Sequence, residues 1–371
     1  MNPHRMFAYA ALLSVLTMGC RPGQPTRPGT VTEDLQDELR RIVESEFPVG
    51  GAAVRVIRGN EAFTVFHGTK SLDAFDPPDE NTVYEMGSIT KTFTATLLAD
   101  NAVRGAVGLH DALRDYLPAD SVTLPSYDGV QISLWHLATH TSGLPQNFSD
   151  AYPLPPGVSA YDPFNHIRAE HVYDYLSHYV SLTRAPGTGY AYSNFGAGLL
   201  GFVLARVHGT DYESLLKTTV LDVLGMDRSS IHWTEAQREN LAVGYDDRLE
   251  AAVSWGSDHV LVGCGSLKST LKDMTAFLKA SMGLLDTDLN DAVALAVTPQ
   301  FAEYICLNWH LETLDDGQTV TFHGGAAAGH MNFIGFNRET ATGAIILYNV
   351  NAFRIHEIGF RILQIAAGTG S

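Results

Sequence analysis

The sequence has few cysteines and no cluster of them. Only Cys20, Cys264 and Cys306 occur in 371 residues. This scarcity excludes a disulfide-stapled scaffold and a cysteine-rich metal site, so no metal is expected. A bridge between Cys264 and Cys306 requires their Cα atoms to lie about 4.4–6.8 Å apart, which sequence does not determine. A disulfide and two buried thiols therefore both remain open.

Basic residues are also scarce. The chain has 24 Lys and Arg residues against 41 Asp and Glu residues, a formal net charge of −17, and it contains no basic run and no glycine-rich phosphate loop. Such a surface repels nucleic acids and anionic lipids, so nucleic acid is not an expected partner. The hydrophobic content of 45% with 18% charged residues is typical of a globular protein.

The longest apolar run lies at the N-terminus. Residues 7–18 follow a basic start and precede Gly19-Cys20. Because a membrane-spanning helix needs about 20 apolar residues, this run predicts a cleaved signal peptide over residues 1–19 rather than a permanent span. We expect Cys20 to be lipidated as in lipoproteins, which would anchor an exported protein in the cell envelope, facing the periplasm; ordinary secretion is the alternative. Residues 20–32 are rich in proline and glycine and predict a tether.

The remaining chain predicts an α+β fold. An amphipathic helix is expected first, then a strand hairpin, a mainly helical middle, a second group of strands and a last helix. These expectations cover helices 33–47, 90–103, 169–180, 196–207 and 353–367, and strands 51–57, 62–66, 302–312, 318–323, 330–337 and 343–349.

The order of these elements predicts one antiparallel sheet built from both ends of the chain. The terminal helices would cover it, and a mainly helical domain would be inserted. Within a single region over residues 33–367, we assign 33–87 and 250–367 to the α/β part and 88–249 to the helical part. The functional site is expected in the cleft between the parts.

Ser88 and Lys91 form the first candidate catalytic pair. A lysine three residues after a serine on a helix shares its face and can exchange a proton with it. The same spacing occurs at Ser214 and at Ser269, so spacing alone is not specific. Only Ser88 follows a glycine and opens a long buried helix, whose N-terminus would favour a developing oxyanion. A capping serine beside a surface lysine is the ordinary alternative.

Two further motifs occur once each, in the expected order. Tyr192 and Asn194 form the only Tyr-x-Asn, in a loop of turn-forming residues that leads into a helix. A nearby lysine favours the phenolate, so Tyr192 could act as a base, while Asn194 could bind a substrate amide. Tyr190, two residues earlier, is the alternative candidate for this base. The only His-x-Gly is His323 to Gly325, where glycines would let a substrate approach a strand edge; a simple turn is the alternative.

Together these motifs resemble the penicillin-recognising superfamily, in its branch of class C β-lactamases and D-alanyl-D-alanine carboxypeptidases, which also includes esterases and D-aminopeptidases. Residues 134–144 resemble the branch's Leu-Leu-Thr-His-Thr-Ser-Gly-Leu segment. Residues 262–278 resemble its Gly-Gly-Leu-x-Ser-Thr stretch, which makes Ser269 a capping residue. His140 is expected to hold a helix end through hydrogen bonds.

The resemblance implies a β-lactamase/transpeptidase-like fold and a serine hydrolase that needs no cofactor. Ser88 would attack the carbonyl, Lys91 and Tyr192 would relay its proton, and the N–H groups of Ser88 and Ala326 would hold the oxyanion. The expected partner is a small-molecule or peptidoglycan-like peptide substrate. Oligomeric state is not predicted.

The third motif departs from the usual Lys-Thr-Gly of class C β-lactamases. A neutral His323 and a glycine at 324 would weaken carboxylate recognition. The resemblance therefore favours a D-alanyl-D-alanine carboxypeptidase-like or esterase-like enzyme, with a class C-type β-lactamase as the alternative. A non-catalytic ligand-binding or sensor protein of the same fold is the alternative from another class.

Overall fold

The computed structural model describes residues 31–148, 152, 164–351 and 354–369. The predicted signal peptide, Cys20 and nearly all of the tether lie outside these residues. Helices in the described part run as follows: α1 Val31–Glu46, α2 Thr90–Val103, α3 Leu134–Ala138, α4 Ala169–His178, α5 Asn194–Val207, α6 Tyr212–Leu216, α7 Asp222–Leu224, α8 Glu235–Glu239, α9 Leu271–Met282, α10 Asn290–Ala296 and α11 Ile355–Ala367. Short helical turns lie at η1 Gly87–Ile89, η2 Leu113–Tyr116, η4 Lys217–Leu221 and η5 Val262–Cys264.

Six antiparallel strands form the main sheet, in the order β2-β1-β8-β7-β6-β5. Strands from both ends of the chain meet where β1 pairs with β8, and this confirms the sheet predicted from sequence. The strands are β1 Gly51–Arg58, β2 Glu61–Gly68, β5 His310–Thr313, β6 Thr319–Ala327, β7 His330–Asn337 and β8 Thr342–Tyr348. A separate pair joins β3 Val83–Glu85 to β4 Lys268–Thr270.

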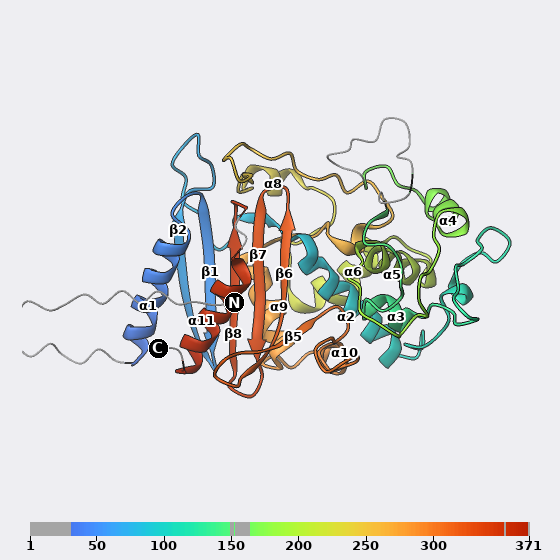
Figure 1. The fold of residues 1–371 in the computed structure, drawn as a ribbon. Coiled ribbons are helices and arrows are strands. Elements are labelled where there is room, and N and C mark those ends of the chain that lie inside the picture. Colours follow the sequence, from blue (N-terminus) through green and yellow to red (C-terminus); the bar gives the residue numbers. More distant parts are fainter. Residues whose placement is uncertain (1–30, 149–151, 153–163, 352–353, 370–371) are drawn as a thin grey trace, which may run out of the picture.

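The sheet separates two hydrophobic cores because side chains alternate along each strand. On β1, Val54 and Val56 pack with α1 and α11, whereas Ala53 and Ile57 face the helical part. Figure 1 shows α1 and α11 on one face of the sheet and most remaining helices beyond its β5–β6 side. In α1, Leu35, Leu39, Ile42 and Val43 are buried as the predicted stripe requires.

Two predictions near the C-terminal strands were wrong at their boundaries. The strand expected over 302–312 begins only at His310, because residues 301–308 form turns in which Ala302, Glu303 and Asn308 adopt positive φ. The strand expected over 318–323 instead continues to Ala327. His323 and the following glycines therefore lie inside β6 rather than in a turn.

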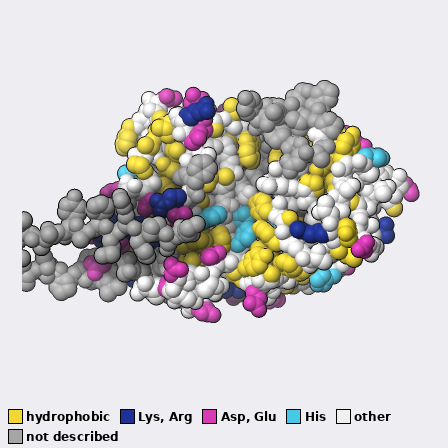
Figure 2. Space-filling view, in the orientation of Figure 1, with side chains coloured by type: hydrophobic (Ala, Val, Ile, Leu, Met, Phe, Trp, Pro, Cys, Tyr) yellow, Lys and Arg dark blue, Asp and Glu magenta, His cyan; other side chains and the backbone are white. Residues whose placement is uncertain are grey.

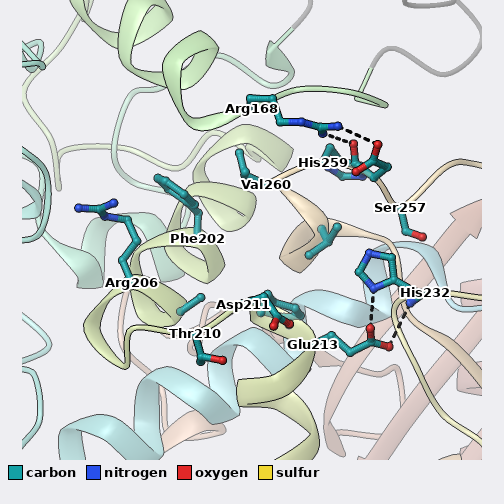
Figure 3. Close-up of a pocket in the computed structure, with 14 residues that line it drawn as sticks. Arg168, Phe202, Arg206, Thr210, Asp211, Glu213, His232, Ser257, His259 and Val260 are labelled. Carbon is teal, nitrogen blue, oxygen red and sulfur yellow. Dashed lines mark hydrogen bonds and ion pairs between the residues drawn. The ribbon is translucent and has the colours of Figure 1, made fainter.

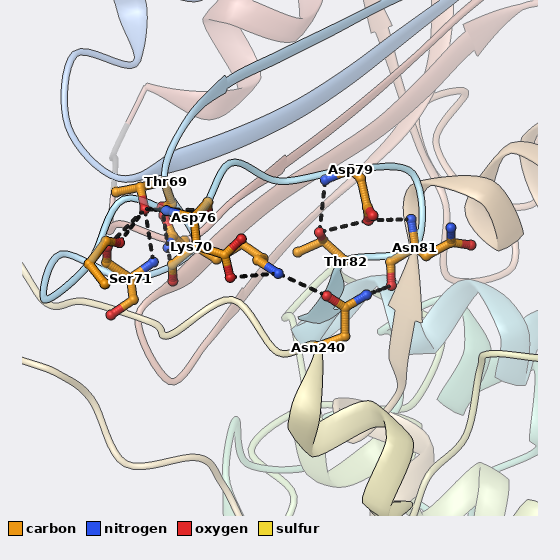
Figure 4. A network of polar contacts seen from close by, with 10 residues as sticks. Thr69, Lys70, Ser71, Asp76, Asp79, Asn81, Thr82 and Asn240 are labelled. Atoms are coloured by element: carbon orange, nitrogen blue, oxygen red, sulfur yellow. Dashed lines mark hydrogen bonds and ion pairs between the residues drawn. The ribbon is translucent and has the colours of Figure 1, made fainter.

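A polar network fixes the connection between β2 and β3 (Figure 4). The Lys70 ammonium binds Asp76 at 2.9 Å and the Asn240 side-chain oxygen at 3.0 Å. Asn240 in turn donates to the carbonyl of Asn81 at 2.8 Å and accepts the N–H of Val83 at its own carbonyl. The network thereby sets the start of β3, which leads directly into η1.

Glycines let β6 pack against η1 without an intervening side chain. A Cβ added at Gly325 would lie 2.0 Å from the Met86 carbonyl oxygen, and one at Gly87 would lie 2.5 Å from the Ala326 carbonyl oxygen. Gly87 also has φ +54°, which L side chains rarely adopt. The serine-bearing turn and the strand edge are therefore in backbone contact.

Gly324 and Gly325 provide a matched test of this packing. A methyl group at Gly325 meets backbone, whereas one at Gly324 meets only the His356 imidazole, which can rotate away. We expect Gly325→Ala to lower the free energy of unfolding by about 1–3 kcal/mol, and Gly324→Ala to have a small effect. Urea unfolding would measure both changes, and equal effects of the two would contradict the close-packing argument.

Candidate active site

Ser88 lies in the turn η1, which continues directly into α2. The sequence had placed it as the first residue of that helix, and the structure corrects this by one short helical turn. Ser88 is half-buried and lines a cavity of about 370 Å³. Its hydroxyl accepts a hydrogen bond from the Lys91 ammonium at 3.0 Å. The i, i+3 spacing thus brings the two groups into direct contact.

Lys91 is fully buried and held at three points. Besides Ser88, its Nζ donates to the Cys264 carbonyl at 2.6 Å and lies 5.0 Å from the centre of the Tyr192 ring. A buried lysine without such partners would be costly, so these contacts fix where its charge sits. The turn η5, which supplies the Cys264 carbonyl, was not recognised from sequence as part of the site.

The other two Ser-x-x-Lys sequences do not form such a pair in the structure. Ser214 lies in α6 and its hydroxyl donates to Asp211, the residue that caps that helix. Ser269 lies in β4 and is fully buried against Ser229. The prediction that Ser269 caps a helix was wrong, because Thr270 caps α9. Each serine is occupied by a structural contact.

Asn194 opens α5 and faces the same cavity as Ser88. Its side-chain amide donates to Asn147 Oδ1 at 2.8 Å, which orients the Asn194 side chain. Asn147 also lines the cavity, yet no motif marks it in the sequence. Only the tertiary structure brings this second amide to the site.

Three histidines surround Tyr192. The ring of Tyr192 lies 4.5 Å from His140 and 6.5 Å from both His310 and His323, measured between ring centres. Figure 2 shows histidine side chains gathered near the middle of the face where the sheet meets the helical part. Tyr190, the alternative tyrosine, shares a hydrogen bond of 3.0 Å with His310 Nε2.

Burial keeps these imidazoles neutral. It lowers the pKa of His310 to about 4 and holds the pKa values of His140 and His323 well below the usual range, with Lys91 adding to the effect. His323 therefore supplies no positive charge to a substrate carboxylate. The sequence had anticipated a neutral histidine here.

Hydrogen bonds assign the tautomers of two of these rings. His140 Nδ1 accepts the Ser193 N–H at 3.1 Å, so its proton is on Nε2. His323 Nδ1 lies 2.6 Å from the Gly324 carbonyl and must donate, so its Nε2 is an acceptor. Both Nε2 atoms are buried without a partner among the described residues. His140 thus holds the N-terminus of α5, as predicted, and one donor and one acceptor remain beside Tyr192.

Ala326 reaches the cavity along the exposed edge of β6. Strand β5 pairs only with Thr319–Phe322, so β6 has no strand partner on that side from His323 onward in the described sheet. Ser88 and Ala326 line the same cavity, and Gly325 faces η1. This arrangement is compatible with two backbone donors that converge on one oxygen atom.

The cysteines resolve the question left open by the sequence. Cys264 and Cys306 are both buried free thiols, and the Cys306 thiol donates to the Val297 carbonyl at 3.1 Å. Burial raises the pKa of Cys264, which opposes its use as a thiolate nucleophile. Within the described residues there is no cluster of His, Cys, Asp or Glu suited to a metal ion.

The fold and this geometry agree with comparisons to known proteins. The beta-lactamase family model matches residues 39–366. The chain belongs to the beta-lactamase family. A beta-lactamase of Pseudomonas fluorescens is 31% identical over 70% of each chain. The D-alanyl-D-alanine-carboxypeptidase/endopeptidase AmpH of Escherichia coli K12 is 28% identical over 74% of this chain and 69% of its own length.

Solved structures support the same fold. A beta-lactamase/D-alanine carboxypeptidase from Yersinia pestis superposes with a TM-score of 0.79 at 22% identity, covering 91% of this chain and 98% of its own. A class C beta-lactamase superposes with a TM-score of 0.76 at 24% identity, covering 90% and 95%. The protein thus has the predicted β-lactamase/transpeptidase-like fold, and its family membership makes it a hydrolase.

Neutral buried histidines predict a stability loss in acid. A histidine whose pKa is lower in the folded than in the unfolded protein binds fewer protons when folded, so its stabilisation is complete above about pH 6.5. For His310 it is lost as pH falls from about 6.5 to about 4. We therefore expect the free energy of unfolding, measured in urea, to fall over this range.

The variant His310→Gln should make this pH dependence shallower, and His110→Gln, which removes an exposed imidazole, is the control. If the free energy of unfolding of the unmodified protein were constant between pH 7 and pH 4, the conclusion that burial keeps these histidines neutral would be wrong.

Proposed function

We propose that the protein is a serine hydrolase that acts through an acyl-enzyme, with Ser88 as the nucleophile. The observation that carries this proposal is the contact between the Ser88 hydroxyl and the fully buried Lys91 ammonium, at the wall of a cavity. The favoured substrates are those of a D-alanyl-D-alanine carboxypeptidase-like or esterase-like enzyme.

In this mechanism Tyr192 starts as the phenolate beside the Lys91 ammonium. As the Ser88 oxygen forms a bond to the acyl carbon, Lys91 takes the Ser88 proton and gives one of its own to Tyr192. Tyr192 then gives that proton to the leaving amine or alcohol as its bond to the acyl carbon breaks. Water repeats the sequence to release the acid and restore Ser88. Tyr192 is proposed for this relay because Lys91 lies over its ring.

The remaining site residues would hold the substrate. The backbone N–H groups of Ser88 and Ala326 are proposed to bind the oxyanion, and loss of one such donor typically costs about 3 kcal/mol of the activation barrier. Asn194, fixed by Asn147, would bind the acyl side chain. His323 and Gly325 would shape the edge of β6 along which the substrate lies.

Of the two favoured activities, the charge of the cavity supports the esterase-like one, because a carboxypeptidase substrate ends in a free carboxylate. No Lys, Arg, Asp or Glu is among its described lining residues, whereas Phe164 and Trp255 give it aromatic walls. With His323 neutral, an anionic group would meet no Lys or Arg among the described lining residues of the cavity, so neutral esters and amides are preferred.

Ser88→Ala tests the nucleophile. We expect a p-nitrophenyl ester to add one acyl group to the unmodified protein, detected as an increase in intact mass, and to add none to the Ser88→Ala variant.

Tyr192→Phe should lower kcat about 10²-fold or more, because it removes a proton-transfer group, while Tyr190→Phe is the matched control. An adduct that persists without Ser88, or equal effects of the two tyrosine changes, would contradict the mechanism.

The same assay separates the substrate classes. Acetyl-D-Ala-D-Ala and its methyl ester differ only in the terminal carboxylate, and the preference argued above predicts faster turnover of the methyl ester. Rapid hydrolysis of benzylpenicillin, which carries a carboxylate, would favour the class C-type β-lactamase instead. Tight binding that is unaffected by Ser88→Ala, without any adduct, would favour a sensor protein.

We also propose that the protein is exported and anchored in the membrane through Cys20. The basic start and short apolar run over residues 1–19 support this, and no described helix is long and apolar enough to cross a membrane. Radiolabelled palmitate should be incorporated into the unmodified protein and not into a Cys20→Ala variant; label in both would contradict the anchor.

The division into an α/β part (33–87 with 250–367) and a helical part (88–249) likewise remains a proposal.

A further inference from the structure

A second cavity lies directly behind the candidate active site. It measures about 380 Å³ and is bordered by α5, the start of α6 and residues 257–262 (Figure 3). His259 lines both this cavity and the one that contains Ser88. We propose that this second cavity binds a small ligand with an apolar body and one carboxylate, and that its occupancy changes the rate at Ser88.

The floor of the cavity is apolar, and the cavity is large enough for a small molecule. Phe202, Tyr212, Val260 and Val262 contribute carbon surface, and the volume lies within the usual range for ligand pockets of about 300–1,000 Å³. The side chain of Tyr212 is held in place, because its hydroxyl shares a hydrogen bond of 2.7 Å with the Thr94 hydroxyl. The floor is therefore preformed.

The rim determines which charge a ligand would carry. Each acidic side chain on it already has a partner: Asp258 binds Arg168 at 2.7 Å, Glu213 binds His232 at 2.5 Å, and Asp211 caps α6. Figure 3 shows the contact between Glu213 and His232.

Among the charged side chains on this rim, Arg206 differs because it has no oppositely charged partner among the described residues. It contacts the Phe202 ring at 5.8 Å. A carboxylate above the apolar floor would complete the pairing of charges, because guanidinium binds carboxylates with paired hydrogen bonds.

A buried imidazole gives a second, independent indication. His259 Nε2 bonds the Ser266 hydroxyl at 3.3 Å, whereas its Nδ1 is buried without a partner among the described residues. Unpaired buried polar atoms are rare and need an explanation, and a molecule bound beside them is one. A ligand with a polar group could satisfy this nitrogen.

The walls of the cavity connect to the catalytic lysine. Val262 begins η5, and Cys264 at the other end of this turn accepts the Lys91 ammonium at 2.6 Å. Thr94 on α2 joins Tyr212 to the Gly263 carbonyl at 2.7 Å. A ligand that presses on Tyr212 or His259 would therefore act on the turn that positions Lys91.

The binding arm of the test needs no catalysis. Isothermal titration of the purified protein would compare 2-naphthoate with its neutral analogue, 2-naphthamide. We expect Arg206→Gln to weaken naphthoate binding about tenfold or more, with little change for naphthamide, and Arg206→Lys to restore part of the loss. Arg248→Gln, at an exposed arginine outside the cavity, is the control. No saturable naphthoate binding, or binding unaffected by Arg206→Gln, would overturn the proposal.

The coupling arm rests on the proposed hydrolase function. Naphthoate should change kcat for a neutral p-nitrophenyl ester in the unmodified protein and in Arg248→Gln, and should leave kcat unchanged in Arg206→Gln. A purely competitive effect on KM that does not depend on Arg206 would place naphthoate in the Ser88 cavity and overturn the inference. If the protein did not hydrolyse esters at all, the proposed function would be contradicted, but the titration would still test naphthoate binding.

Discussion

Backbone contact between β6 and the turn η1 is the constraint on which the site depends. The proposed nucleophile Ser88 lies in η1, whereas the proposed second oxyanion donor, Ala326, lies in β6 of the sheet. Side chains between them would hold the two backbones apart, and the glycines at 87 and 325 remove that obstacle. The polar network at Lys70 and Asn240 supports the same junction by fixing how β3 enters η1. The chemistry is therefore placed by packing between two parts that are far apart in the chain.

Charge at the site is controlled by burial rather than by many ion pairs. Lys91 is buried and satisfied by a hydroxyl, a carbonyl and a ring face, while the histidines around Tyr192 are kept neutral. Neutral imidazoles can donate and accept hydrogen bonds without adding positive charge beside the lysine. This environment is compatible with the proton relay proposed for Ser88, Lys91 and Tyr192, and it gives little electrostatic support to an anionic substrate.

The turn η5 connects the candidate site to helices α2 and α5. It supplies the carbonyl that holds Lys91, and it forms part of the wall of the second cavity. Because one short turn serves both surfaces, a change on one side can be transmitted by a few direct contacts through Tyr212, Thr94 and His259. No large domain movement is needed for such coupling.

The family, the antiparallel sheet built from both chain ends, and the candidates Ser88, Lys91, Tyr192 and His323 could all be predicted from sequence patterns. These features are local: helical spacing, strand alternation and short motifs are properties of neighbouring residues. The extension of β6 through its glycines accompanies its contact with η1, which is distant in sequence. The start of β5 and the cap of α9 at Thr270 instead follow local turns and hydrogen bonds that no motif marked. Other features depend on contacts between residues that are far apart in the sequence, which local patterns do not record. They are the contact of Asn147 with Asn194, the Cys264 carbonyl at Lys91, the free thiols and the second cavity.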